Sequence, residues 1–254
     1  MGKGTELVAE IRRANRVLCE DGSLATLSSG IDDPCGSLLR RMTLETRPKV
    51  AIEVGLAFGI STLYLLDALA ELGSGLLIGM DPAQHDGTWR GGGLANVRAA
   101  GLSRFYEFHE RSSQDLLPEL VARGLRAQLA FIDGWHTYDH TLVDFFFVDR
   151  LLEPGGIVVL DDVGYPAIRR VCDFVLTNRA YELVEGVALA TPRTPRPKAL
   201  LKRLFGAAFG PLVRTDRTPD PEARRAEASI DDLYFAAFRK VSDDTRRFDH
   251  FVPF

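Results

Sequence analysis

Apolar residues along this chain follow two alternating patterns. Uninterrupted runs of mainly aliphatic residues recur between positions 50 and 162, and most segments between them carry apolar residues at helical spacing. Strands that are apolar throughout and alternate with helices indicate a parallel sheet that helices cover on both faces. We therefore predict a doubly wound α/β fold whose first five strands occupy 50–54, 75–81, 105–110, 129–133 and 157–162.

The chain before this pattern is mainly helical. Residues 5–20 have helical spacing, 22–36 are rich in Ser, Gly and Asp, and 37–46 return to helical spacing. We predict a helical N-terminal cap over residues 1–47 and an α/β domain over residues 48–254. Such a cap either covers a substrate or pairs with a neighbouring subunit, and both alternatives stay open.

The chain after the fifth strand continues the pattern and then leaves it. A helix is predicted over 166–179, a strand over 181–190, and a last strand over 232–240 that fits an antiparallel position near the sheet edge. Residues 191–228 begin proline-rich and contain a basic amphipathic run, 198–205, so we predict an insertion there. A lid or a dimer contact is favoured over a membrane-surface helix because the basic run is short. The predicted sheet is seven-stranded, mostly parallel and Rossmann-like.

The first strand runs into an acid and two glycines, in the pattern Glu53-x-Gly55-x-x-x-Gly59. Gly55 lets the backbone turn and approach a ligand closely, and Gly59 lets the next helix pack on its strand. The pattern predicts a site for a nucleotide-like ligand at the start of that helix, where Ser61 adds a hydroxyl. A dinucleotide-dependent oxidoreductase is an alternative, but its fingerprint needs a glycine where this chain has Ala57.

Acidic residues follow four of the five predicted strands. They are Glu53, Asp81, Asp133 and the pair Asp161 and Asp162. Because ligands of such sheets bind at the carboxyl ends of the strands, we expect these acids to line one rim of the binding site. Asp81 also lies at the distance from the glycine turn that is typical of an acid that binds a ribose.

Composition and charge exclude several classes of partner. With 254 residues, 46% of them hydrophobic, the chain is long enough to bury one sizeable core. A net charge of -4 and a pI of about 5.8 give no basic footprint for nucleic acid. No signal peptide or membrane span is evident, and Cys19, Cys35 and Cys172 are far apart, as in reduced proteins. We therefore predict a cytoplasmic protein with no nucleic-acid or membrane partner.

Five motifs of the chain, taken together and in order, resemble those of a known family. They are Glu53 to Thr62, Asp81, Ser113 to Leu120, Phe131 to Tyr138, and Leu152 to Asp162. Over roughly residues 48–180 their order and spacing resemble the class I S-adenosylmethionine-dependent methyltransferases. More narrowly, they resemble the metal-dependent O-methyltransferases of the catechol and natural-product sugar type. The resemblance implies S-adenosylmethionine as cofactor, with Mg²⁺ beside it.

The resemblance also implies which residues bind the cofactor. Asp81 would accept hydrogen bonds from both ribose hydroxyls, as an ionised carboxylate can. Ser113 and Gln114 would reach the adenine edge, although Ser113 also fits a plain helix cap. Trp135 would pack against the cofactor, or else fill the core. The other residues implied to bind the cofactor are Glu53, Gly55, Gly59 and Ser61, beside its methionine part, and Asp133.

Asp133, Asp161 and Asp162 match the positions that hold a divalent cation in the metal-dependent members of that family. Three carboxylates at adjacent strand ends cannot all stay ionised without a cation or raised pKa values. Oxygen ligands with room for water suit Mg²⁺. The alternative is that Asp133 or Asp162 caps the following helix and that no metal binds.

His136 stands where the catechol-type enzymes have a lysine as general base. A neutral histidine is a competent base near neutral pH, so we predict His136 and Asp133 as the catalytic residues. The alternatives are that His136 orients Asp133 or is a structural loop residue. A zinc site from His136 and His140 is disfavoured because no third soft ligand is near them in the sequence.

The predicted reaction is transfer of a methyl group to a hydroxyl of a small molecule. Such a transfer is an in-line displacement, so the enzyme supplies alignment and a deprotonated acceptor oxygen. We predict a sugar or glycoside as the acceptor, and a homodimer or higher homo-oligomer as the assembly. A metal-independent N-methyltransferase that acts on an amino sugar is the alternative within the same fold.

Overall fold

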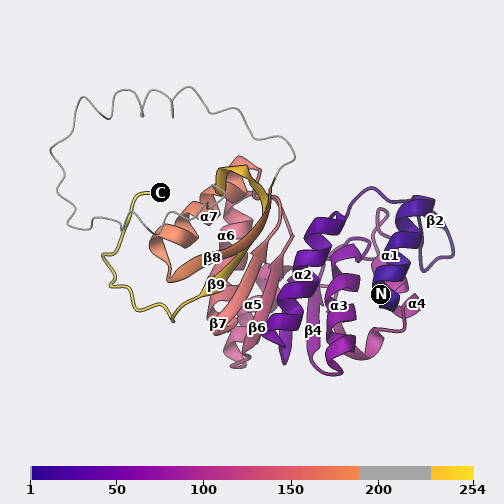
Figure 1. Ribbon diagram of the computed structural model, residues 1–254, viewed down its shortest axis with the longest axis horizontal. Coiled ribbons are helices and arrows are strands. Elements are labelled where there is room, and N and C mark those ends of the chain that lie inside the picture. Colours follow the sequence, from indigo (N-terminus) through magenta and orange to yellow (C-terminus); the bar gives the residue numbers. More distant parts are fainter. Residues whose placement is uncertain (1, 189–229) are drawn as a thin grey trace.

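The computed structural model describes residues 2–188 and 230–254, and its centre is one seven-stranded sheet (Figure 1). The first five strands of this sheet along the chain pair in parallel, and β9 pairs antiparallel with both β7 and β8. The predicted mostly parallel, seven-stranded fold is confirmed. From one edge to the other the strands are β5 (Tyr106–His109), β4 (Leu76–Met80), β3 (Val50–Val54), β6 (Ala127–Ile132), β7 (Leu152–Leu160), β9 (Leu233–Lys240) and β8 (Tyr181–Ala188).

Helices cover both faces of this sheet, as a doubly wound fold requires. Successive residues of a strand point to opposite faces, and β3 follows this rule. Ala51 belongs to the core cluster shared with α1 to α4, whereas Ile52 belongs to the cluster shared with α5 to α7. The helices are α1 (Lys3–Ala14), α2 (Asp33–Thr46), α3 (Ile60–Leu72), α4 (Gly92–Ala99), α5 (Ser113–Ala122), α6 (Tyr138–Leu151) and α7 (Pro166–Asn178), with short 3-10 turns η1 (Ser103–Phe105) and η3 (Ile230–Asp232).

The N-terminal region differs from the prediction of one helix over 5–20 followed by a loop. Helix α1 ends at Ala14 because Asn15 adopts a left-handed conformation with φ 50°, which asparagine tolerates better than most residues. The chain then forms a hairpin from β1 (Arg16–Leu18) and β2 (Leu24–Thr26). Val17 in this hairpin is fully buried, so the position that fitted a helical stripe is instead the inward residue of a short strand.

The N-terminal cap shares a core with the sheet domain. The buried carboxylate of Asp67 in α3 accepts hydrogen bonds from the backbone N–H groups of Gly4 (2.8 Å) and Thr5 (2.7 Å). These N–H groups belong to the first turn of α1, which has no partner for them within the helix. Helix α2 begins at Asp33, earlier than predicted, because Asp32 caps it through the N–H of Cys35 (3.0 Å).

The C-terminal strands complete the sheet on the side away from the cap (Figure 1). Strand β9 lies second from the edge, between β7 and β8, which agrees with its predicted position near the edge. The predicted strand 181–190 is described as far as Ala188, and the predicted insertion 191–228 lies outside the described residues. In the part of the chain that the structure describes, we find no helix with the length and apolar character needed to cross a membrane.

Candidate active site

The turn after β3 requires glycine at its first position. Gly55 has φ 92°, and a Cβ on it would lie 2.0 Å from the backbone oxygen of Asp133, so a side chain cannot be accommodated there. Gly59 precedes α3 with φ 72°, and a Cβ on it would lie 3.2 Å from the backbone oxygen of Gly93. Ala57, between them, also has a positive φ of 46°. The turn therefore brings bare backbone to the carboxyl end of β3, as the motif predicted.

Glu53 is fully buried beneath this turn. Its carboxylate accepts hydrogen bonds from the hydroxyls of Ser61 (2.7 Å) and Thr62 (2.8 Å), both in the first turn of α3. Burial raises the pKa of Glu53 to about 7, the two hydroxyls oppose that shift, and the charge of Asp81 adds to it. Ser61 therefore holds Glu53 in place through a direct hydrogen bond.

Asp81 follows β4 and is bound by the backbone of the glycine turn. One of its oxygens accepts from the N–H groups of Leu56 (3.1 Å) and Ala57 (3.0 Å), and the other accepts from Ala83 (2.9 Å). Its side chain is almost completely buried yet contributes to the wall of the main cavity. These three donors fix the carboxylate before any ligand arrives.

A cavity of about 640 Å³ opens above the carboxyl ends of β3, β4 and β6. Ser29 from the cap and Trp89, whose ring packs edge-on against Phe58 at 4.9 Å, line it, although the sequence patterns did not identify either residue. Glu53, Gly59 and Ser61 are not among the residues of its wall. The predicted cofactor residues that do line it are Gly55, Asp81, Ser113, Gln114, Asp133 and Trp135, together with the predicted base His136.

One end of this cavity is acidic. Asp133 after β6, His136 in the following loop and Asp162 after β7 each offer a ligand atom, and these atoms lie within 4.8 Å of one another. His136 Nδ1 lies 3.1 Å from Asp162 Oδ2. The predicted ligand Asp161 is not part of this group; its Oδ1 instead accepts from the N–H of Asp162 (2.6 Å), which has φ 53°. In this group of three possible ligands, His136 therefore takes the place that we predicted for Asp161.

Burial raises the pKa of all three predicted metal-binding acids. Burial, and then the charges of Asp161, Asp162 and Glu53, raise the pKa of Asp133 well above its usual range. Burial raises the pKa of Asp161 to about 7, against the hydrogen bond from the N–H of Asp162. Burial also raises the pKa of Asp162, and the nearby His136 opposes this shift. This end of the cavity therefore favours a bound cation or bound protons.

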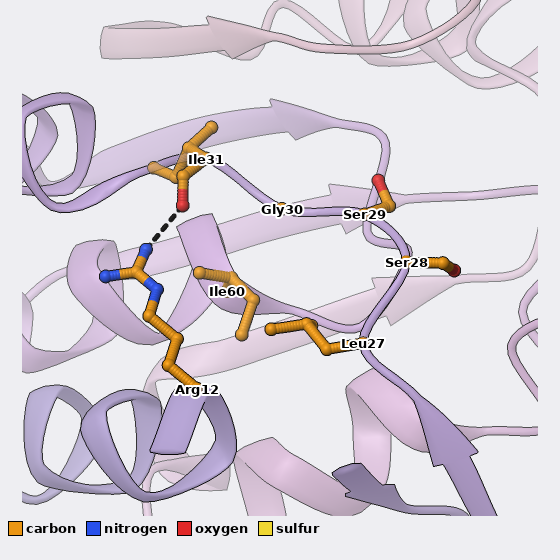
Figure 2. Close-up of a pocket in the computed structure, with 7 residues that line it drawn as sticks. All are labelled: Arg12, Leu27, Ser28, Ser29, Gly30, Ile31 and Ile60. Atoms are coloured by element: carbon orange, nitrogen blue, oxygen red, sulfur yellow. Dashed lines mark hydrogen bonds between the residues drawn. The ribbon is translucent and has the colours of Figure 1, made fainter. Parts of the chain in front are cut away.

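A second, smaller cleft of about 230 Å³ lies beside the first, under the cap (Figure 2). The guanidinium of Arg12 crosses it, donates to the backbone oxygen of Ile31 and pairs with Asp33. Ser29 lines both cavities, so the two cavities meet at this residue of the cap. The cap therefore supplies part of the wall of the main cavity.

The strand order, the glycine turn after β3 and the acid after β4 together define the fold of the class I S-adenosylmethionine-dependent methyltransferases. Residues 52–163 match the family model described as a methyltransferase domain. Over residues 52–163 the chain is therefore similar to methyltransferase domains, in agreement with the predicted resemblance.

Several solved structures share this fold. The O-methyltransferase TomG from Streptomyces achromogenes, solved with S-adenosylmethionine and involved in tomaymycin synthesis, is 18% identical with a TM-score of 0.58, over 74% of this chain and 82% of that one. Cofactor-bound Rv0187 from MTB is 13% identical with a TM-score of 0.62, over 95% and 91% of the two chains. An O-methyltransferase from Bacillus cereus in complex with SAH is 17% identical with a TM-score of 0.55, over 74% and 84%. No curated protein matches the sequence.

Proposed function

We propose that this protein is an S-adenosylmethionine-dependent O-methyltransferase that methylates a hydroxyl of a small molecule. The observation that carries the proposal is that one cavity is lined by Gly55, Asp81 and Ser113 together with Asp133 and His136. A cofactor bound along its first part would present its reactive end to the acidic cluster. The methyltransferase-domain match and the similarity to structures described as O-methyltransferases support this proposal.

The chain's own groups fit the cofactor in three places. The fixed carboxylate of Asp81 suits two ribose hydroxyls, because a carboxylate has lone pairs left after accepting three N–H groups. Ser113 and Gln114 offer polar groups for the adenine edge at the start of α5. The side chain of Trp135 is 70% exposed in the wall, which leaves its ring available to pack on a ligand. S-Adenosylmethionine supplies the transferable methyl group when bound.

The acidic end of the cavity fits a divalent cation. We include in the proposal Mg²⁺ held by Asp133 and Asp162, with His136 beside them and the predicted ligand Asp161 next to Asp162, outside the group of converging ligand atoms. Support comes from the raised pKa of each of these acids, since a cation would stabilise the buried carboxylates in their ionised form. Such a cation lowers the pKa of an acceptor hydroxyl that binds it.

His136 is the proposed general base. If its Nδ1–H donates to Asp162 Oδ2, the other ring nitrogen, Nε2, keeps a lone pair that can accept a proton. The carboxylate of Asp162 would then also stabilise the protonated ring. A side chain of His136 that is half-exposed in the cavity wall is accessible to an acceptor from the solvent side.

A sugar or glycoside with neighbouring hydroxyls is the proposed acceptor class, because a cation with free coordination sites can bind two adjacent oxygens. The second candidate is an N-methyltransferase acting on an amino sugar, for which one of Asp133, Asp162 and His136 would take the proton that the amine must lose before its nitrogen can attack the methyl group. The homo-oligomeric assembly and the cytoplasmic location stay predictions.

Calorimetric titration tests this proposal. S-Adenosylhomocysteine is titrated into chelator-treated protein, and a panel of glycosides is then titrated with and without Mg²⁺. Cofactor binding together with acceptor binding only in the presence of Mg²⁺ is the expected result. Acceptors that bind equally without Mg²⁺ would remove the metal from the proposal and leave His136 acting alone. Absence of cofactor binding would overturn the whole assignment.

A further inference from the structure

A half-exposed histidine joins two carboxylates that come from separate parts of the chain. His85 lies in the loop between β4 and α4, and its ring nitrogen Nδ1 lies 2.6 Å from Oε2 of Glu110, just after β5. The other ring nitrogen, Nε2, lies 3.0 Å from Oε2 of Glu20, in the turn between β1 and β2. The backbone N–H of His85 also donates to Glu110 Oε1 (2.9 Å). His85 therefore connects the N-terminal cap to the edge of the sheet.

Both contacts of the ring are hydrogen bonds only when the ring is protonated. A neutral imidazole has one N–H, the imidazolium has two, and ionised carboxylates only accept. The charged groups that face the ring are Glu110 and Glu20, and Arg98 of α4 pairs with the other oxygen of Glu20. The hydrogen bonds to Glu110 and then to Glu20 raise the pKa of His85. A neutral His85 would keep only one of the two ring hydrogen bonds.

Glu20 also holds the far end of the same loop. Its backbone N–H donates to the backbone oxygen of Arg90 (3.1 Å), the residue after Trp89. Gly91 follows with φ 71°, and a Cβ on it would lie 2.5 Å from Glu20 Cγ, so the glycine leaves room for the Glu20 side chain. The loop is thus attached to Glu20 both at His85 and at Arg90.

This loop brings Trp89 into the wall of the main cavity. The ring of Trp89 packs edge-on against Phe58 of the glycine turn, with ring centroids 4.9 Å apart. The start of the loop is fixed separately, because the side chain of the buried Gln84 donates to the backbone oxygen of Ala57 (3.0 Å). The segment after Gln84, which carries Trp89, is held by the contacts of His85 described above.

We propose that His85 is a positioning residue that, in its protonated form, holds the cap to the loop that carries Trp89 and so keeps Trp89 in the wall of the cofactor cavity. The inference rests on the proposed function, in which this cavity binds S-adenosylmethionine. When the ring is neutral, one carboxylate contact is lost, the loop leaves its position more often, and the cofactor binds more weakly.

The sign of the pH dependence follows from the direction in which the pKa of His85 shifts. The linked form raises this pKa above its ordinary value of 6.5. The contribution of the link is therefore fully present below about pH 6.5 and is lost as the pH rises through the raised pKa.

The test is calorimetric titration of S-adenosylhomocysteine into the full chain at pH 6 and pH 9, in wild type, His85→Arg and His85→Ala. Other groups that titrate in this range are common to the three proteins, so affinity ratios isolate the effect of His85. Arginine stays charged and can donate to both carboxylates. Wild type and His85→Arg should agree within about twofold at pH 6, and wild type should bind about threefold to fivefold more weakly at pH 9, the size expected for a partly exposed ion pair.

His85→Ala keeps the test decisive even if arginine does not fit between the two carboxylates. It should bind about threefold to fivefold more weakly than wild type at pH 6 and within about twofold of wild type at pH 9. Glu20→Gln removes the charge that His85 meets on the cap and should behave as His85→Ala at pH 6. His109→Ala is the matched control, because His109 pairs with Glu107 of its own strand (2.7 Å), and its affinity should follow wild type at both pH values.

Fluorescence measures the position of Trp89 without any cofactor. The two tryptophans of the chain, Trp89 and Trp135, both line the cavity, so in a Trp135→Phe background the emission reports on Trp89 alone. Acrylamide quenching of this emission should increase between pH 6 and pH 9 with His85 present. With His85→Arg in the same background, quenching should stay at its lower value.

The outcomes separate this inference from the proposed function. If wild type binds S-adenosylhomocysteine and its affinity relative to His85→Ala is the same at pH 6 and pH 9, the inference is wrong and the proposed function stands. Quenching of Trp89 that does not change when His85 is replaced would also overturn the inference. If wild type binds no S-adenosylhomocysteine at either pH, the proposed function fails and the inference fails with it.

Discussion

The acids near the glycine turn and the acids near His136 differ in how the protein stabilises their carboxyl groups. We call these two regions the cofactor end and the acceptor end of the site, after the proposed function. At the cofactor end, Glu53 accepts from two hydroxyls and Asp81 from three backbone N–H groups. At the acceptor end, burial and like charges raise the pKa of Asp133, and no hydrogen bond is among the causes that act on it. The chain's own donors thus satisfy the carboxylates at the cofactor end. At the acceptor end, a cation or bound protons would have to stabilise them.

This difference indicates which part of the site is preorganised. Groups fixed by the fold bind a ligand without further ordering, so the cofactor end should bind with little rearrangement. At the other end, ionising Asp133 and Asp161 would create buried charge, which is costly unless a cation or protons neutralise it. Substitutions at the two ends should therefore affect different measurements.

The largest effect is expected for Asp133→Asn. Removing this carboxylate weakens cation binding and acceptor activation, and turnover should fall by about 10³-fold. Affinity for S-adenosylhomocysteine should change by less than about threefold, because Asp81 and the glycine turn remain intact. Single-turnover methyl transfer and calorimetry measure the two quantities. A similar loss in Asp139→Asn, an exposed acid nearby, would mean that the effect is not specific to the acidic cluster.

The next effect is on folding stability, in Glu53→Gln. Glu53 has a pKa of about 7 in the folded protein against 4.5 as reference, so the folded state binds the proton more tightly. The stability contribution of Glu53 is therefore fully present below pH 4.5 and falls as the pH rises to about 7. The neutral variant should be more stable than wild type by up to about 3 kcal/mol at pH 8 and should flatten this pH dependence.

Denaturant titrations between pH 4.5 and 8 measure this effect, with the exposed Glu107→Gln as control. A variant that is less stable than wild type at pH 8 would show that the hydrogen bonds from Ser61 and Thr62 outweigh the cost of burying the charge. Cofactor affinity is expected to weaken in Glu53→Gln at the same time, so stability and binding would move in opposite directions.

A smaller effect is expected for Asp81→Asn at the cofactor end. The amide keeps one acceptor oxygen for the backbone donors but loses the charge and half of the acceptor capacity. Affinity for S-adenosylhomocysteine should fall by about tenfold to thirtyfold. Calorimetry measures it, and an unchanged affinity would show that Asp81 only closes the glycine turn.

The smallest effect is expected for Gly59→Ala. An alanine at φ 72° is strained, and its Cβ would lie 3.2 Å from the Gly93 oxygen, so the free energy of unfolding should fall by about 1–2 kcal/mol. Gly73→Ala is the matched control, because it has φ 71° and nothing within 4 Å of an added Cβ. An equal or larger loss in the control would mean that the left-handed φ alone accounts for the effect and that the contact with the Gly93 oxygen adds nothing.

The sheet could be predicted because its strands are long apolar runs that end in acids. The β1 and β2 hairpin could not, because three-residue strands carry too few positions to distinguish period 2 from helical spacing. Val17 fits both patterns, and only its pairing with Ala25 decides between them.

Some of the site residues could likewise be predicted from the sequence, and others could not. Asp81 and Asp133 follow their strands directly, and their positions could be inferred from the strand ends. Whether Asp161 or its neighbour Asp162 joins Asp133 and His136 depends on the left-handed φ of Asp162, which the sequence does not reveal. Trp89 and Ser29 reach the cavity from loops, where no periodicity indicates the direction of a side chain.

The pairing of β8 with β9 has a consequence for how this chain tolerates change. Ala188, the last described residue before position 189, is in register with Leu233, close to the start of the next described stretch. The closure entropy of a connection grows only slowly with its length. We therefore expect changes in the length or sequence of the connection between β8 and β9 to cost little free energy of folding. The strands on either side of it, which lead to Asp161 and Asp162, should be unaffected.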